Sequence, residues 1–105
     1  MAETFSSAVA VDIGTADKVL HTATAKAIII GGNFSNKTAF ELPITVWIER
    51  GASVVTVVKD ARVLGNQNAE IIKGKLVLEV GDVVKARCPL DNAFDSLISY
   101  MTGIN

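Results

Sequence analysis

Residues 44–49, Ile44-Thr45-Val46-Trp47-Ile48-Glu49, alternate between a large aliphatic side chain and a residue of another kind. Successive side chains of a β-strand point to opposite faces of the sheet, so the three aliphatic residues share one face. The same alternation recurs in residues 76–80 and in residues 84–88, where Lys85 and Arg87 occupy the outward positions. Each stretch therefore predicts a strand with one face toward a core.

Short runs rich in β-branched residues recur along the whole chain, and turn residues separate them roughly every ten positions. This spacing is typical of a sandwich or barrel and differs from that of alternating strands and helices. We predict an all-β chain that folds as a single antiparallel β-sandwich. The expected strands are residues 8–13, 19–23, 26–35, 44–50, 53–58, 61–64, 70–72, 75–80, 82–88 and 94–102.

Turn residues mark the expected boundaries between these runs. Gly74 and the segment 79–82 should each reverse the chain, and the second turn is predicted to join residues 75–80 and 82–88 as a hairpin. Gly31-Gly32 lacks the spacing of a phosphate-binding loop, so we interpret it as a β-bulge or a close backbone contact. Because residues 1–7 show no alternation, we predict an N-terminal arm at 1–7 and a sandwich domain at 8–105.

The composition limits the partners that the chain can have. The 105 residues carry a formal net charge of -1 without a run of Lys or Arg, so a nucleic-acid partner is not expected. No apolar run reaches the roughly 18 residues of a membrane span, so no membrane is expected. Cys88 is the single cysteine, which rules out an internal disulfide and favours a reducing compartment.

Half of the residues are hydrophobic, and several runs are apolar on both faces. Residues 27–30 and 54–58 are examples, and a chain of this size cannot cover both faces of such strands with its own elements. We therefore expect a neighbouring subunit to supply the cover, which predicts a homo-oligomer.

No catalytic or metal-binding pattern in the sequence meets the geometric requirements of its chemistry. His21 and Cys88 are the only residues that could form a Cys-His pair, and nothing in the sequence orients them. The Asp residues are scattered at strand ends, whereas calcium or zinc needs clustered ligands. We predict a protein that is not an enzyme and that has no cofactor and no metal site.

Three aromatic residues are candidates for a protein interface: Phe5, Phe40 and Trp47. Trp47 is out of phase with the core face of its strand, and large aromatic residues are enriched at the centres of interfaces. A loop at residues 39–43 could cover Trp47 equally well. Phe5 could anchor the N-terminal arm in a groove of a neighbour, or the arm could extend a sheet edge; a disordered tail is the other interpretation.

Over residues 18 to 102, the succession of predicted strands and turns resembles that of small virion proteins of tailed bacteriophages. The segments that carry the resemblance are residues 21–27, 28–36, 44–47, 58–61, 74–82 and 93–101. The resemblance implies a β-sandwich or jelly-roll module that serves as a capsid decoration (cement) protein. A collar, neck or tail-associated structural protein is the alternative.

The same resemblance implies a trimer, contacts with the major capsid protein or other virion proteins, and a location in the virion after assembly in the host bacterial cytoplasm. A carbohydrate-binding sandwich is a weaker alternative, because such a module needs exposed aromatic residues as a platform and only Trp47 looks presented by a strand.

Overall fold

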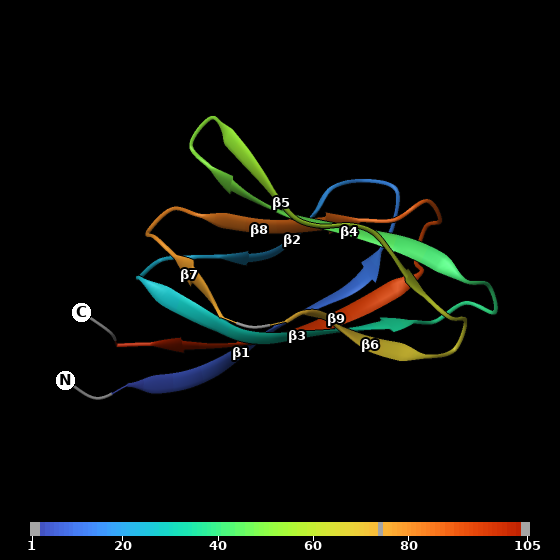
Figure 1. Ribbon diagram of the computed structural model, residues 1–105, viewed down its shortest axis with the longest axis horizontal. Coiled ribbons are helices and arrows are strands. Elements are labelled where there is room, and N and C mark those ends of the chain that lie inside the picture. Colours follow the sequence, from blue (N-terminus) through green and yellow to red (C-terminus); the bar gives the residue numbers. More distant parts are fainter. Residues whose placement is uncertain (1–2, 74, 104–105) are drawn as a thin grey trace.

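The computed structural model describes residues 3–73 and 75–103, which form two β-sheets packed face to face (Figure 1). Within these residues the strands are β1 (Thr4–Ile13), β2 (Lys18–Thr22), β3 (Ala27–Asn36), β4 (Leu42–Arg50), β5 (Ser53–Val63), β6 (Asn68–Ile72), β7 (Leu76–Leu78), β8 (Val83–Arg87) and β9 (Phe94–Thr102). The first sheet, sheet A, has the order β1-β9-β3-β6, and β7 also pairs with β3. The second sheet, sheet B, has the order β2-β8-β4-β5.

The strand pairs are nested around the β4–β5 hairpin. β4 pairs with β5, β3 with β6 and β7, β2 with β8, and β1 with β9, and every pair is antiparallel. Successive pairs fall alternately in sheet B and sheet A, as in a long hairpin rolled around a core, which is the jelly-roll arrangement. The predicted all-β antiparallel sandwich is confirmed.

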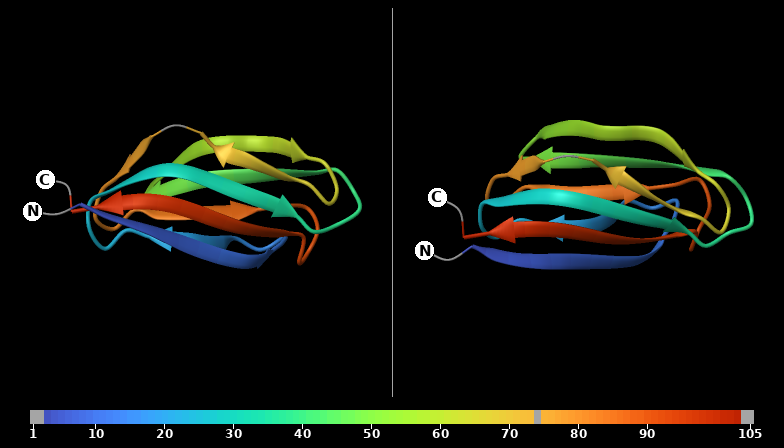
Figure 2. Two further views of the ribbon diagram at one scale, coloured as in Figure 1. Left: turned by 90° about the horizontal axis from the view of Figure 1, so that it is seen from below. Right: turned by 60° about the horizontal axis from the view of Figure 1, so that its bottom comes forward.

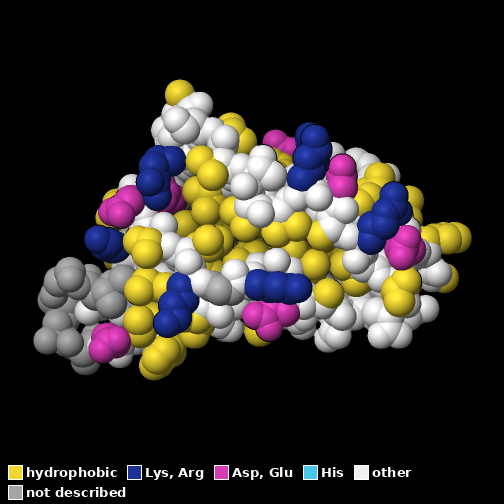
Figure 3. Space-filling view, in the orientation of Figure 1, with side chains coloured by type: hydrophobic (Ala, Val, Ile, Leu, Met, Phe, Trp, Pro, Cys, Tyr) yellow, Lys and Arg dark blue, Asp and Glu magenta, His cyan; other side chains and the backbone are white. Residues whose placement is uncertain are grey.

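The core lies between the two sheets. Ile44, Val46 and Ile48 point into it, so the inward face predicted for residues 44–49 is confirmed. Figure 3 shows apolar side chains in a band between the two layers, with charged side chains above and below it. The largest fully buried apolar side chains are Phe34, Phe94, Ile13, Ile29, Ile44, Ile72, Leu78, Ile98, Val46 and Val84.

One continuous strand, β5, replaces the two strands predicted at 53–58 and 61–64. Asp60 lies between them with a φ of 52°, and the β4–β5 register shifts beside it. The Thr45 hydroxyl accepts a hydrogen bond from the Asp60 backbone N–H at 3.1 Å. A β-bulge therefore absorbs the irregular residue without ending the strand.

The predicted hairpin of residues 75–80 and 82–88 is wrong. The turn itself forms, because the Asp82 N–H donates to the Glu79 carbonyl at 3.1 Å and Gly81 adopts a φ of 93°. However, β7 pairs with β3 in sheet A and β8 pairs within sheet B, so the turn leads from one sheet to the other. Alternation shows that two segments are strands and cannot show which partners they choose. The predicted turn residue Gly74 lies outside the described residues.

The sheet begins earlier than the predicted boundary at residue 8. β1 starts at Thr4, and Phe5 pairs with Met101 of β9, so residues 4–7 belong to sheet A. Backbone hydrogen bonds to a neighbouring strand require no hydrophobic alternation, which is why the pattern did not reveal them. Residues 1–2 of the predicted arm lie outside the described residues.

The predicted bounds of β9 agree with the observed ones. The remaining strand boundaries lie within two residues of the predicted positions. Gly31-Gly32 forms the predicted irregularity, because the pairing of β3 shifts register on both sides of it. A Cβ atom on Gly32 would lie 2.9 Å from side-chain carbons of Ile72, so the close contact is also confirmed.

Candidate functional site

Between Phe5 and Val11, the edge strand β1 turns its alanines inward and its larger apolar side chains outward. Ala10 is buried and Ala8 partly buried, whereas Phe5 and Val9, on the opposite side of the strand, are 70% and 71% exposed. Val11 is exposed on the same side. β1 therefore presents its bulkier apolar side chains to the outside of sheet A.

Neighbouring strands continue this apolar surface in cross-strand rows. Phe5 pairs with Met101, Met101 with Ile28, and Ile28 with Val77, so one row crosses β1, β9, β3 and β7. A second row begins with the pair of Val9 and Leu97 and continues through Asn33 to Glu70, so it is apolar on β1 and β9 alone. The left view of Figure 2 shows these strands side by side from outside sheet A.

The outward side chains of these rows and their neighbours form one surface, which we call the apolar face. It consists of Phe5, Val9, Val11, Ile28, Ile30, Val77, Leu97 and Met101. Adjacent exposed apolar side chains of this kind, rather than single ones, mark interaction surfaces.

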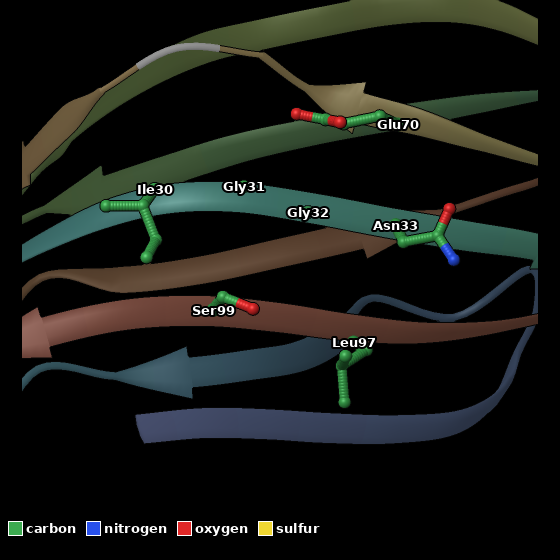
Figure 4. A pocket seen from close by; sticks show the side chains of 7 residues that line it. All are labelled: Ile30, Gly31, Gly32, Asn33, Glu70, Leu97 and Ser99. Atoms are coloured by element: carbon green, nitrogen blue, oxygen red, sulfur yellow. The ribbon is translucent and has the colours of Figure 1, made fainter. Parts of the chain in front are cut away.

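A shallow hollow of about 330 Å³ lies in the middle of the apolar face. Gly31, which has no side chain, and Ser99, which has a small one, leave room there, and Ile30, Leu97 and Glu70 surround them (Figure 4). Ser7 pairs with Ser99, and Ser99 pairs with Gly31, so the hollow continues a row of small residues between the row that begins at Phe5 and the row that begins at Val9. Protruding apolar side chains beside a row of small residues can interdigitate with the side chains of another protein.

The three predicted interface residues lie in separate places. Phe5 belongs to the apolar face, and Phe40, 65% exposed, lies in the loop between β3 and β4. The Asn36 side chain donates to the Phe40 carbonyl at 2.7 Å and holds this loop against the sandwich. Trp47 lies on the outward side of β4 in sheet B.

Trp47 is covered by its own chain, with 7% of the residue exposed. The Arg87 guanidinium lies 5.6 Å from the centre of the indole ring, and the indole N–H donates to Glu49 at 3.0 Å. Arg87 and Glu49, both on strands of sheet B, contribute to this cover, which leaves little of the indole for a partner or a sugar. The strand-presented aromatic residue on which the carbohydrate alternative depended is therefore enclosed.

His21 and Cys88 are too far apart for a catalytic pair. His21 pairs with Val84 of β8, and Cys88 follows the end of the same strand four positions later, roughly 13 Å along it. The His21 ring packs against Tyr100 with a centroid separation of 4.4 Å, and burial lowers the pKa of its imidazole. Cys88 is buried, as expected, and its burial raises the pKa of the thiol.

Charged groups lie around the sandwich in pairs. The Lys37 ammonium donates a hydrogen bond to Asp12 and contacts Asp95 at 3.0 Å, and these two carboxylates raise the pKa of the lysine. Among residues 3–73 and 75–103, no three His, Cys, Asp or Glu side chains gather closely enough to hold a metal ion. In the same described ranges no helix has the length and apolar character needed to cross a membrane.

No protein-family model matches the chain, and no curated protein shows a significant match. Solved structures match over nearly the whole chain. A chain of the disulfide-linked pili that form Bacillus endospore appendages is 10% identical, with a TM-score of 0.58 over 99% of this chain and 88% of that one.

Two chains of infectious bursal disease virus are also similar. A chain of strain Gx is 11% identical with a TM-score of 0.56, over 100% of this chain and 34% of that one. A chain from T=1 particles is 10% identical with a TM-score of 0.59, over 94% and 31%. The chain thus spans about a third of the length of these viral chains, and the similarity at such low identity is one of fold.

Proposed function

We propose that this protein is a non-enzymatic structural component of a virion, a decoration or cement protein that stabilises the capsid through protein–protein contacts. The observation that carries the proposal is the apolar face, in which the row from Phe5 through Met101 and Ile28 to Val77 contains no charged side chain. Exposing such a row to water is unfavourable, and covering it with protein is favourable.

The fold similarity adds support of a general kind, because the three matching structures are pili and virus particles, which are assemblies of repeated subunits. Partners of the proposed function are further copies of this chain, with a trimer as the state that the phage resemblance implies, and the major capsid protein. The location is the virion, assembled in the host bacterial cytoplasm.

Sedimentation velocity on matched variants tests the role of the apolar face. Leu97→Lys puts a charge in the apolar face, whereas Leu64→Lys changes another exposed leucine, which lies between β5 and β6. We expect the apparent mass of the sedimenting wild type to exceed the 11.1 kDa of the monomer. Leu97→Lys should weaken the association about tenfold or more, and Leu64→Lys should leave it unchanged.

Antibody labelling of purified particles in the electron microscope tests the virion role. Labels distributed over the capsid surface are expected, together with lower thermal stability of particles that lack the protein. Labels confined to the neck or tail would instead show the collar, neck or tail-associated alternative. A monomeric wild type that is absent from purified particles would contradict the proposal.

A further inference from the structure

Strand β1 forms one rim of sheet A and pairs only with β9 among the strands of the described chain. The right view of Figure 2 shows β1 at the lower edge of the molecule, with no strand beyond it. Half of its backbone N–H and C=O groups therefore point away from the sheet. Such an edge can pair with another strand.

The other long edge of the sandwich carries features that discourage pairing. β5 bears Lys59 and Arg62, and the positive φ of Asp60 bends it at a bulge. β2, at the other edge of sheet B, has five residues and a register shift. Short strands, charged residues and bulges are the usual protections of an edge.

β1 lacks these protections over most of its length. It runs for ten residues, and the segment from Thr4 to Val11 contains neither a charged residue nor a proline. The irregularity of β1 comes only at its end, where the register with β9 shifts between Ala10 and Ile13. The first two thirds of β1 are thus an open, regular edge.

The side chains of this edge match a second copy of the same edge. In an antiparallel pair centred on Ser7, Phe5 of one copy lies opposite Val9 of the other on the outer side. Ser6 lies opposite Ala8 on the inner side, and no charged residues face each other. Phe5 and Val9 already contact the rows of the apolar face through Met101 and Leu97, so the pairing makes the two apolar faces continuous.

From this geometry we propose that two copies of the chain join edge to edge, β1 against β1, about a two-fold axis at Ser7. The contact extends sheet A across both copies, and each copy contributes the same surface. The inference rests on the proposed function in so far as both require self-association. A two-fold contact joins two copies, so within the proposed function it links one trimer to another and does not form the trimer itself. The outward side of the apolar face remains available for other contacts.

Cysteine cross-linking tests the axis. Ser7→Cys places two thiols opposite each other, within reach of a disulfide. Ser99→Cys lies on the same face one strand inward, where three strand spacings of about 4.8 Å put the two copies roughly 14 Å apart, beyond that reach. Mild oxidation followed by thiol blocking and denaturing electrophoresis should show a covalent dimer for Ser7→Cys only. Equal cross-linking of both variants, or of neither, in a protein that self-associates would overturn the pairing.

A charge swap at Ser7 tests the same β1–β1 contact without disulfide chemistry. Ser7→Lys and Ser7→Asp should each be monomeric at concentrations where the wild type associates, and an equimolar mixture should associate again. If neither variant changes the association of the wild type, the β1 contact is wrong while the proposed function stands. If the wild type is monomeric throughout and does not bind particles, both are wrong.

Discussion

The Arg50 guanidinium donates hydrogen bonds to both carboxylate oxygens of Asp82, from Nε to Oδ1 at 2.9 Å and from Nη2 to Oδ2 at 2.7 Å. The pair joins the end of β4 to the turn between β7 and β8, which leads from sheet A to sheet B. Asp82 Oδ2 also accepts the Glu79 N–H at 2.9 Å. With 1% of its side chain exposed, Asp82 depends on these donors for the solvation that water would otherwise supply.

Asp82→Asn should destabilise the fold by about 1–3 kcal/mol at neutral pH, because the amide turns a donor toward groups that are themselves donors. Asp17→Asn is the matched control, since Asp17 faces Arg87 at 3.6 Å on the exposed surface. Urea unfolding of both variants and the wild type measures the difference. A loss as small as that of Asp17→Asn would contradict a structural role for the Arg50–Asp82 pair.

Acid should weaken the same pair. Hydrogen bonding from Arg50 holds the pKa of Asp82 below its ordinary value of 3.8, so the folded protein resists protonation more than the unfolded chain does. The contribution to stability is therefore complete above about pH 3.8 and is lost as the pH falls through the lowered folded-state pKa. The gap in unfolding free energy between the wild type and Asp82→Asn should narrow on acidification, and a constant gap would argue against this linkage.

Ser96→Ala should leave the stability unchanged or raise it by about 1 kcal/mol. Ser96 points into the core, and within the described residues its hydroxyl has no hydrogen-bond partner. Removing an unsatisfied buried hydroxyl relieves its desolvation cost. Thermal unfolding measures the effect, with Ser99→Ala on the outward side of β9 as the control. Marked destabilisation would show that the hydroxyl has a partner.

Gly32→Ala should destabilise the fold by about 1–3 kcal/mol, because the new methyl group would lie 2.9 Å from Ile72 in a packed core. Gly31→Ala is the matched control. Its methyl group would meet only Glu70, at the ordinary contact distance of 3.5 Å. Chemical denaturation of the two variants should separate them clearly, and equal stabilities would mean that β6 moves to make room.

Cys88 should react slowly with a thiol reagent in the folded protein and rapidly after unfolding. Its side chain is buried and lies 3.1 Å from the Leu90 carbonyl oxygen. Burial raises the pKa of the thiol, so little of the reactive thiolate forms at neutral pH. Labelling followed by mass spectrometry with and without urea tests this expectation, and native-state labelling at the unfolded rate would contradict it.

Local chemistry in the sequence was sufficient to predict much of this protein. Alternation at Ile44, Val46 and Ile48 identified an inward face, and Gly31-Gly32 indicated a bulge, because both depend on residues within a few positions of each other. The high share of hydrophobic residues, and the runs that are apolar on both faces, indicated that part of the surface would require a partner. Phe5 was predicted as an interface anchor on an N-terminal arm; the structure places it, exposed, in strand β1, and its interface role stays a prediction.

Only the tertiary structure decided which apolar residues face outward. In Ala8-Val9-Ala10-Val11 both sides of the strand are apolar, so the pattern cannot tell the core from the surface; the fold turns the alanines inward and leaves Val9 beside Leu97 on the outside. Trp47, by contrast, lies on the outward side of its strand and is nevertheless buried, because Arg87 of β8 covers it. Pairing partners come from distant parts of the chain, and burial depends on them, so neither could be inferred from local periodicity.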